Sequence, residues 1–190
     1  VFNKILVHIS VQTVAAYQVA GRLDMLVFLP IFSIAASLTT LIGMFYGAKE
    51  FEALRFTIRY GIISALIITI FSSALVYIFA DQVVRFFTED ESIVLIAVNF
   101  LQIFAFAYPF IAVGITTGRV LQGLGKGLPV LVITIVRVLG VSAPLALFFV
   151  FIMEKSVEWV WYSMMLSTVV AFAIGLTWLF STIKKLPVKK

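Results

Sequence analysis

The sequence has no cysteine and a single histidine, His8, among its 190 residues. Without cysteine there is no disulfide framework, thiol nucleophile or thiolate-bound metal. A single histidine excludes the metal and catalytic motifs that need two. Charged residues are also scarce, at 12% of the chain against roughly 25% in ordinary soluble domains. We therefore expect neither a metalloenzyme nor a protein with a large water-facing surface.

Hydrophobic residues fill the space that the charges leave. They make up 63% of the chain, against roughly 45–50% in a soluble domain, and the mean hydropathy is +1.16. One small core cannot cover so much apolar surface, so the sequence predicts an integral membrane protein with the lipid bilayer as its surroundings. The net charge of +5 does not require a nucleic-acid partner, because basic loops beside apolar spans serve to orient membrane proteins.

Long runs without charge locate the membrane crossings. A helix of about 20 residues crosses the hydrocarbon core, whereas a strand of a membrane barrel needs only about 10 residues of alternating polarity. The predicted fold class is therefore all-α, a polytopic transmembrane helix bundle forming a single lobe without a soluble domain. Five full spans and the end of a sixth are expected at about residues 1–8 (partial), 14–47, 60–80, 92–118, 127–153 and 159–183.

The basic residues predict the orientation of these spans. Nine of the fourteen Lys and Arg residues fall on the side of the C-terminus and four on the other. The positive-inside rule makes the richer side, with the C-terminus, cytoplasmic. The expected inner residues are Lys49, Arg55, Arg59, Arg119, Lys126, Lys184, Lys185, Lys189 and Lys190, and the expected outer ones are Lys4, Arg22, Arg85 and Lys155.

Two local patterns add detail. Within residues 48–59, Phe51, Leu54 and Ile58 recur at helical spacing among charges, which predicts a short amphipathic helix on the inner membrane surface. Trp159, Trp161 and Tyr162, near the start of the last span, and Trp178, near its end, are expected at the membrane interfaces, where tryptophan and tyrosine are enriched.

Two glycine motifs receive structural interpretations. The segment Gly123–Gly127 resembles a phosphate-binding loop, but it lacks the first glycine and the Ser/Thr of that motif, and no strand precedes it. A tight turn between helices is expected instead. Gly43 and Gly47 fit the GxxxG pattern, which we interpret as packing within the bundle rather than a dimer contact. We predict no catalytic residue, metal site or cofactor, and we do not expect an enzyme.

Three charges near or within the spans are candidates for function. Arg137 lies ten residues after Gly127, about 15 Å along its helix. An arginine there costs about 2.5–3.5 kcal/mol on insertion scales, so it should face a cavity or an ion-pair partner, or reach back toward the cytoplasm. Arg22 and Asp24 point about 200° apart on one helix and cannot pair with each other. Both an interfacial position and a place in a transport pathway are open to them. 

Five stretches in order resemble the multidrug and toxic compound extrusion (MATE) family, specifically its C-terminal half. They are VAAYQVAGRLDML, LTTLIGMFYGAKEFEALR, FFTEDESIVLIAVNFL, RVLQGLGKGLPV and IVRVLGVSAPLAL. The resemblance implies two six-helix lobes around a central cavity and export of organic, often cationic, drugs in exchange for Na⁺ or H⁺. This chain would supply the end of helix seven and helices eight to twelve, paired with a complementary N-terminal lobe. It opens at Val1, as expected of a fragment or a processed chain.

The resemblance also sets expectations for the site and its location. Residues 92–118, which match helix ten, hold no acid, so the coupling ion is expected in the missing half, and the protein in the cell membrane. Two alternatives are open: a flippase for lipid-linked oligosaccharides of the same superfamily, which a large cationic cavity would favour, and a non-transporting scaffold subunit. The candidate cavity or ion-pair residues are Gln18, Arg22, Asp24, Gln102, Tyr108 and Arg137.

Overall fold

The computed structural model describes residues 2–153 and 156–187, and every regular element in these ranges is helical. Five helices are long and apolar enough to cross a membrane, so the predicted all-α bundle is confirmed. The predicted loop bases Lys155, Lys189 and Lys190, together with the side chains of Lys4 and His8, lie outside the described residues. The elements are α1 (Phe2–Ile9), α2 (Val11–Gly47), α3 (Phe51–Arg85), α4 (Glu91–Gly123), α5 (Leu128–Ile135), η1 (Val136–Ser142), α6 (Ala143–Leu147), η2 (Phe148–Ile152) and α7 (Glu158–Lys184).

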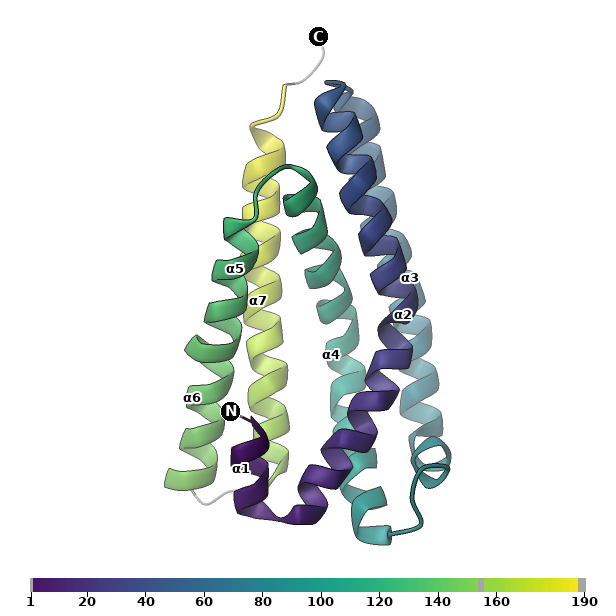
Figure 1. The fold of residues 1–190 in the computed structure, drawn as a ribbon, viewed down its shortest axis with the longest axis vertical. Coiled ribbons are helices and arrows are strands. Elements are labelled where there is room, and N and C mark those ends of the chain that lie inside the picture. Colours follow the sequence, from purple (N-terminus) through teal and green to yellow (C-terminus); the bar gives the residue numbers. More distant parts are fainter. Residues whose placement is uncertain (1, 154–155, 188–190) are drawn as a thin grey trace.

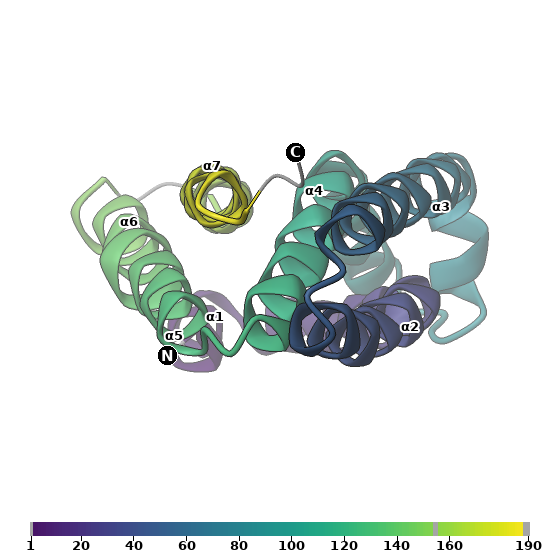
Figure 2. The ribbon, with the colours of Figure 1, turned by 90° about the horizontal axis from the view of Figure 1, so that it is seen from above.

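Successive spans run in opposite directions along the bundle (Figure 1). The turns after α2 and α4 lie at the same end as the last turn of α7, and the turns after α1 and α3 lie at the opposite end. Seen from above, α4 stands between α7 on one side and α2 and α3 on the other (Figure 2). The prediction of orientation from the basic residues assumes this alternation. The side of the membrane that each end faces stays a prediction.

The central helix α4 packs directly on α2, where glycine permits a close approach. A Cβ atom on Gly123 would lie 2.8 Å from the carbonyl oxygen of Thr39 and 2.9 Å from the Cβ of Ile42, and a Cβ on Gly43 would lie 3.6 Å from the carbonyl oxygen of Gly123. A Cβ on Gly47 would meet nothing within 4 Å. Gly43 therefore packs within the bundle as predicted, whereas Gly47 takes no part in this contact.

The predicted amphipathic helix at residues 48–59 is wrong. Helix α3 begins at Phe51 and runs without a break to Arg85. Leu54 and Ile58 are buried in one core cluster with Leu121 and Leu179. Two of the apolar positions assigned to the membrane surface are thus covered by neighbouring helices, and the segment is the first part of the long helix α3.

Of the four aromatic residues predicted at the membrane interfaces, Trp159, Tyr162 and Trp178 are exposed, but the prediction for Trp161 is wrong. Its side chain is fully buried. The indole stacks on Tyr17, with ring centroids 5.8 Å apart and an interplanar angle of 8°, and meets the ring of Phe100 edge-on at 4.9 Å. This aromatic cluster joins α2, α4 and α7, so the tryptophan anchors helix packing rather than the protein's depth in the membrane.

Both turns that flank α4 have clear local causes. The Asp90 side chain caps the helix by accepting hydrogen bonds from the backbone N–H groups of Ser92 and Ile93. The hydrogen bond from the Ser92 side chain, with those from the backbone, holds the pKa of Asp90 below its usual value. At the other end, Gly125 adopts a φ of 75° and the chain reverses between Gly123 and Leu128, which confirms the predicted tight turn.

The span from Leu128 to Ile152 changes its helical geometry along its length. Helix α5 passes into the π-helical segment η1, which contains Arg137, and then into α6 and η2. Pro144 is the second residue after η1 and has no N–H to donate to the preceding turn. The π-helical geometry is rare in proteins, and where it occurs it is often at a functional site. This span is therefore a natural place to look for a polar centre.

Candidate functional site

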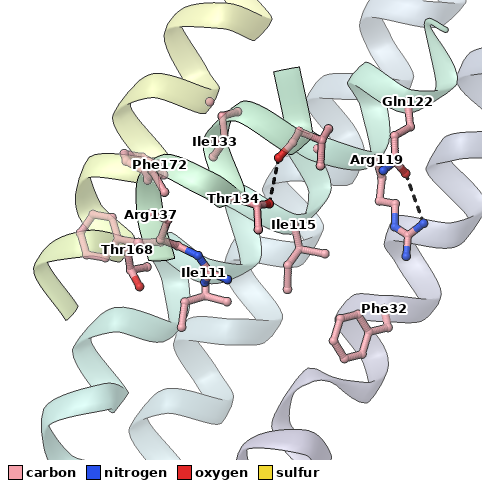
Figure 3. Close-up of a pocket in the computed structure, with 16 residues that line it drawn as sticks. Phe32, Ile111, Ile115, Arg119, Gln122, Ile133, Thr134, Arg137, Thr168 and Phe172 are labelled. Atoms are coloured by element: carbon pink, nitrogen blue, oxygen red, sulfur yellow. Dashed lines mark hydrogen bonds between the residues drawn. The ribbon is translucent and has the colours of Figure 1, made fainter. Parts of the chain in front are cut away.

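A cavity of about 320 Å³ lies between α2, α4, the α5–η1 segment and α7. Its wall is a mixture of aromatic, aliphatic and glycine positions, and the side chains with polar groups come from three of these elements (Figure 3). These polar lining residues are Arg119, Gln122, Thr134, Arg137 and Thr168.

Helix α4 forms one wall of the cavity through a single stripe of residues. Ile111, Gly114, Ile115, Gly118 and Gln122 recur at three- and four-residue spacing, and all of them line the cavity. A Cβ atom added to Gly114 would meet nothing within 4 Å. The helix therefore presents small residues where the hollow lies, and two polar side chains, Gln122 and its neighbour Arg119, at one end of the stripe.

The charge of this cavity is positive. Arg119 donates a hydrogen bond to the side-chain oxygen of Gln122, at 3.3 Å, and no hydrogen bond or ion pair of Arg137 occurs among the described residues. All ion pairs among the described residues lie away from the cavity, near the turn after α3, where Arg85 pairs with two carboxylates. No Asp or Glu belongs to the cavity lining, so the two guanidinium groups face it without a counter-charge.

Arg137 reaches the cavity from η1 and is half-buried. Figure 3 shows its side chain extending from the η1 ribbon toward the labelled Ile111, between Thr168 and Ile115, with Arg119 on the far side beside Gln122. Of the arrangements that the sequence left open, the structure therefore places Arg137 at a cavity. An ion-pair partner for it is absent from the residues described.

A second polar centre joins α2 to α4. Tyr108 is fully buried and its hydroxyl donates a hydrogen bond to Asp24 Oδ1. The ring of Phe28 meets Tyr108 edge-on, with centroids 5.3 Å apart, and lies 6.4 Å from the ring of Phe32, which lines the cavity. Asp24 thus has its partner on a neighbouring helix, and the pair is linked to the cavity through two aromatic rings.

The remaining predicted residues lie elsewhere. Gln18 and Arg22 are exposed, on the side of α2 that points away from Asp24. Gln102 lines a separate hollow of about 250 Å³ with Tyr77, Asn99 and Tyr162. The structure therefore brings together only two of the six predicted residues, Asp24 and Tyr108, and places Arg137 in the cavity nearby.

Sequence reasoning missed four polar residues of the cavity. Arg119 was counted only as a loop base that sets orientation, and Gln122, Thr134 and Thr168 were not singled out. The available signal was the spacing of Gly114 and Gly118 one turn apart, immediately followed by Arg119 and then Gln122 on the same stripe. Among the described residues, no cluster of three or more His, Asp or Glu side chains could hold a metal ion.

Comparison with known proteins places these features in a family. A model of the MatE family matches residues 1–148. The probable multidrug resistance protein NorM of Thermotoga maritima is 28% identical over 154 residues, which is 81% of this chain and 32% of that protein. The NorM protein of Bacillus cereus is 26% identical over 174 residues, or 90% of this chain and 37% of its own length. The chain thus spans about a third of the length of these relatives.

Solved transporters share the fold closely. An outward-facing multidrug resistance MATE transporter of the MOP superfamily superimposes with a TM-score of 0.88 at 28% identity, over 97% of this chain and 41% of its own. A MOP superfamily transporter from Pyrococcus furiosus, reported to have a binding pocket of reverse polarity, gives a TM-score of 0.89 at 28% identity, over 98% and 42% of the two chains. With the family model matching more than half of its residues, this chain belongs to the MATE family of membrane transporters.

Proposed function

We propose that this chain forms one lobe of a multidrug exporter coupled to Na⁺ or H⁺, and that the cavity of Arg119 and Arg137 is part of the wall of its substrate path. One observation supports this most strongly: a cavity with polar groups lies between helices long and apolar enough to cross a membrane, beside a helix whose geometry is interrupted. Transporters characteristically bind substrate near the bilayer midplane, at the interface between repeats and next to discontinuous helices. Relatives named as probable multidrug resistance proteins support export of drugs as the function.

The coupling ion belongs, in this proposal, to the complementary N-terminal lobe. No carboxylate lines the cavity, and of the Asp and Glu residues in the described ranges only Asp24 is not exposed. A bound Na⁺ needs several oxygen ligands, and one carboxylate with one tyrosine hydroxyl offers few of them. Asp24 therefore assists helix packing beside the cavity, and ion exchange takes place in the other lobe.

The charge of the cavity favours a second candidate substrate class. Two guanidinium groups without a carboxylate suit an anionic compound better than a cationic drug. The flippase alternative, in which the substrate is a lipid-linked oligosaccharide with a phosphate group, fits the same charge. The P. furiosus transporter with a binding pocket of reverse polarity shows that the fold accommodates more than one pocket charge.

The test separates these classes by flux in proteoliposomes. The lobe is produced with its complementary lobe, reconstituted under a Na⁺ or H⁺ gradient, and supplied with a cationic dye or an anionic dye of similar size. Drug export predicts gradient-driven movement of the cationic dye, while anionic transport predicts movement of the anionic dye that falls at least about tenfold in Arg137→Gln, since one lost charge-assisted contact is worth that much.

The control variant is Arg22→Gln, because Arg22 is exposed and lies outside the cavity lining. It should transport either dye as the parent protein does. A scaffold role is indicated instead if neither dye moves in the parent protein, and if Arg137→Leu and Asp24→Asn leave the assembly of the two lobes unchanged. Such a result would overturn the proposal of transport.

A further inference from the structure

The face of the bundle opposite the cavity carries a long apolar groove between α3, α4 and α7. Its volume is about 640 Å³. Phe110 and Phe172 line both hollows and therefore form part of the partition between them. In Figure 2, α7 and α3 lie toward one side of the bundle and α5 and α2 toward the other, with α4 between them. The helices that line the groove and those that line the cavity therefore meet on different sides of α4. The groove thus lies apart from the proposed substrate path.

The groove is apolar along its length and cationic at one end. Arg55 and Arg59 are its charged members, and they are spaced so that both lie on one face of α3, with Ile62 and Leu66 continuing the same stripe. Helix α7 supplies the opposite wall with apolar residues such as Leu176. An occupant of this groove therefore needs a long hydrocarbon part and one anionic end.

The two arginines are available to bind an anion. Arg55 is half-buried and held in place by a hydrogen bond from Nη2 to the carbonyl oxygen of Leu186, at 3.1 Å, and Arg59 is exposed. Neither arginine forms an ion pair with any of the described residues, although Glu52 and Glu50 precede Arg55 closely in the sequence. A guanidinium fixed through one nitrogen still presents its other donors, which suit the oxygens of a phosphate.

The length of the groove matches one leaflet of a bilayer. From Arg55 to Leu66, eleven residues along α3 correspond to about 16 Å, whereas the whole hydrocarbon core is about 30 Å thick. The cationic end lies where α3 begins and α7 ends, at the end of the bundle that also carries Lys184 and Lys185. In a bilayer whose surface lies at this end, the arginines would be level with the lipid headgroups and the apolar stripe level with the acyl chains.

We propose that this groove binds one anionic phospholipid, with its phosphate on Arg55 and Arg59 and its acyl chains along the apolar walls of α3 and α7. Basic pockets between membrane helices on the cytoplasmic side bind anionic headgroups in this way. An uncharged occupant would fill the groove but leave both guanidinium groups without a counter-charge. Because α3 and α7 each pack on α4, the bound lipid bridges the two helices beside it. The site does not depend on the proposed export function.

The experiment measures lipid binding to the complete chain in detergent by native mass spectrometry. The probes are dioleoyl phosphatidylglycerol, dioleoyl phosphatidylcholine with the same chains, and glycerol 3-phosphate, which has the anion without the chains. We expect one equivalent of phosphatidylglycerol to bind, and the other two probes to bind at least about tenfold more weakly. In Arg55→Gln/Arg59→Gln, the affinity for phosphatidylglycerol should fall about 10- to 30-fold, since each basic residue near the membrane surface contributes about fivefold to the binding of an anionic lipid.

Three further variants keep the test decisive. Arg55→Lys/Arg59→Lys retains the charges and should retain binding. Leu176→Trp narrows the groove without a change of charge and should weaken both lipids. Arg59→Gln alone removes an exposed side chain with no hydrogen bond among the described contacts, so it reports on the site if the double variant fails to fold, and we expect a loss of at least about threefold.

The matched control is Arg119→Gln, which removes one charge from the same end of the bundle but on the opposite face. It should bind phosphatidylglycerol as the parent chain does. If Arg119→Gln lowers the affinity for phosphatidylglycerol, the lipid occupies the cavity of Arg119 and Arg137 and the proposal is wrong. Equal affinity for the two lipids, unchanged binding in the double glutamine variant, or equal binding of glycerol 3-phosphate would overturn it as well.

Discussion

A carboxylate within an apolar bundle requires a polar partner, and Asp24 has one in the buried hydroxyl of Tyr108. We predict that Tyr108→Phe lowers the free energy of unfolding by about 1–3 kcal/mol, because it leaves a half-buried carboxylate without its described partner. The measurement is thermal or detergent-induced unfolding of the purified chain. Asp24→Asn keeps an oxygen that accepts the same hydrogen bond, so its effect should be smaller.

The matched control for this hydroxyl is Tyr77→Phe. Tyr77 is 46% exposed and its ring packs on Phe106, so its hydroxyl can reach polar groups outside the bundle. We expect this change to alter stability by no more than about 0.5 kcal/mol. Equal losses from Tyr108→Phe and Tyr77→Phe would show that the bond between Asp24 and Tyr108 contributes nothing to the folded state.

At the scale of the helices, the contact between α2 and α4 depends on Gly123. A Cβ there would lie 2.8 Å from a backbone oxygen, which cannot move aside as the end of a side chain can. We predict that Gly123→Ala destabilises the chain by about 1–3 kcal/mol through forced separation of the helices. Gly47→Ala adds its Cβ to open space and should be neutral or stabilising by up to about 1 kcal/mol. Unfolding curves that rank the two variants the other way would contradict this packing.

The spans themselves could be predicted from sequence because the bilayer fixes the length and the polarity of each crossing helix. What the sequence could not reveal is which apolar residue meets lipid and which meets another helix. Phe51 was therefore predicted within a surface helix but begins α3 in the structure, and Trp161 was predicted at the interface but is buried in the core. The change to π-helical geometry at η1 was not predicted either, since hydrophobic periodicity over seven residues does not distinguish a π-helix from an α-helix.

The candidate site was predictable only in part, for a related reason. Charges within apolar runs stand out, so Asp24 and Arg137 could be found from the chain alone. Their surroundings depend on which helices are neighbours, and neither the hydrogen bond from Tyr108 nor the approach of Arg119 to the same cavity is written in local spacing. Gln18 and Gln102 were polar within predicted spans, yet they face other surfaces of the bundle.

At the scale of the whole molecule, the distribution of basic residues predicts which end of the bundle is cytoplasmic. Glu89 and Lys185 are both exposed and lie at opposite ends. In intact cells, an impermeant thiol reagent should label Glu89→Cys and leave Lys185→Cys unlabelled until the membrane is opened. The chain has no native cysteine to interfere. The reverse pattern of labelling would invert the orientation, and with it the leaflet from which the groove of Arg55 and Arg59 takes its lipid.

The extent of the match to known transporters leads to the last prediction, that these 190 residues alone do not perform coupled export. The chain covers 41–42% of the solved MATE and MOP superfamily transporters that it resembles, and transport between repeats requires one repeat to move against the other. The walls of the cavity of Arg119 and Arg137 come from this one lobe, and its lining contains no carboxylate that could exchange a coupling ion. Polar groups facing hydrocarbon are costly, so we expect a complementary lobe to cover this face.

The measurement is reconstitution of residues 1–190 into liposomes under a Na⁺ or H⁺ gradient, with the cationic and anionic dyes in separate samples. We expect no gradient-driven movement of either dye, and movement once the complementary lobe is present in the same membrane. Dye movement by the isolated chain would instead require two copies of this lobe to enclose a path. In that case Asp24, the one carboxylate in the described ranges that is not exposed, becomes the group on which coupling must depend, and Asp24→Asn should abolish the gradient dependence.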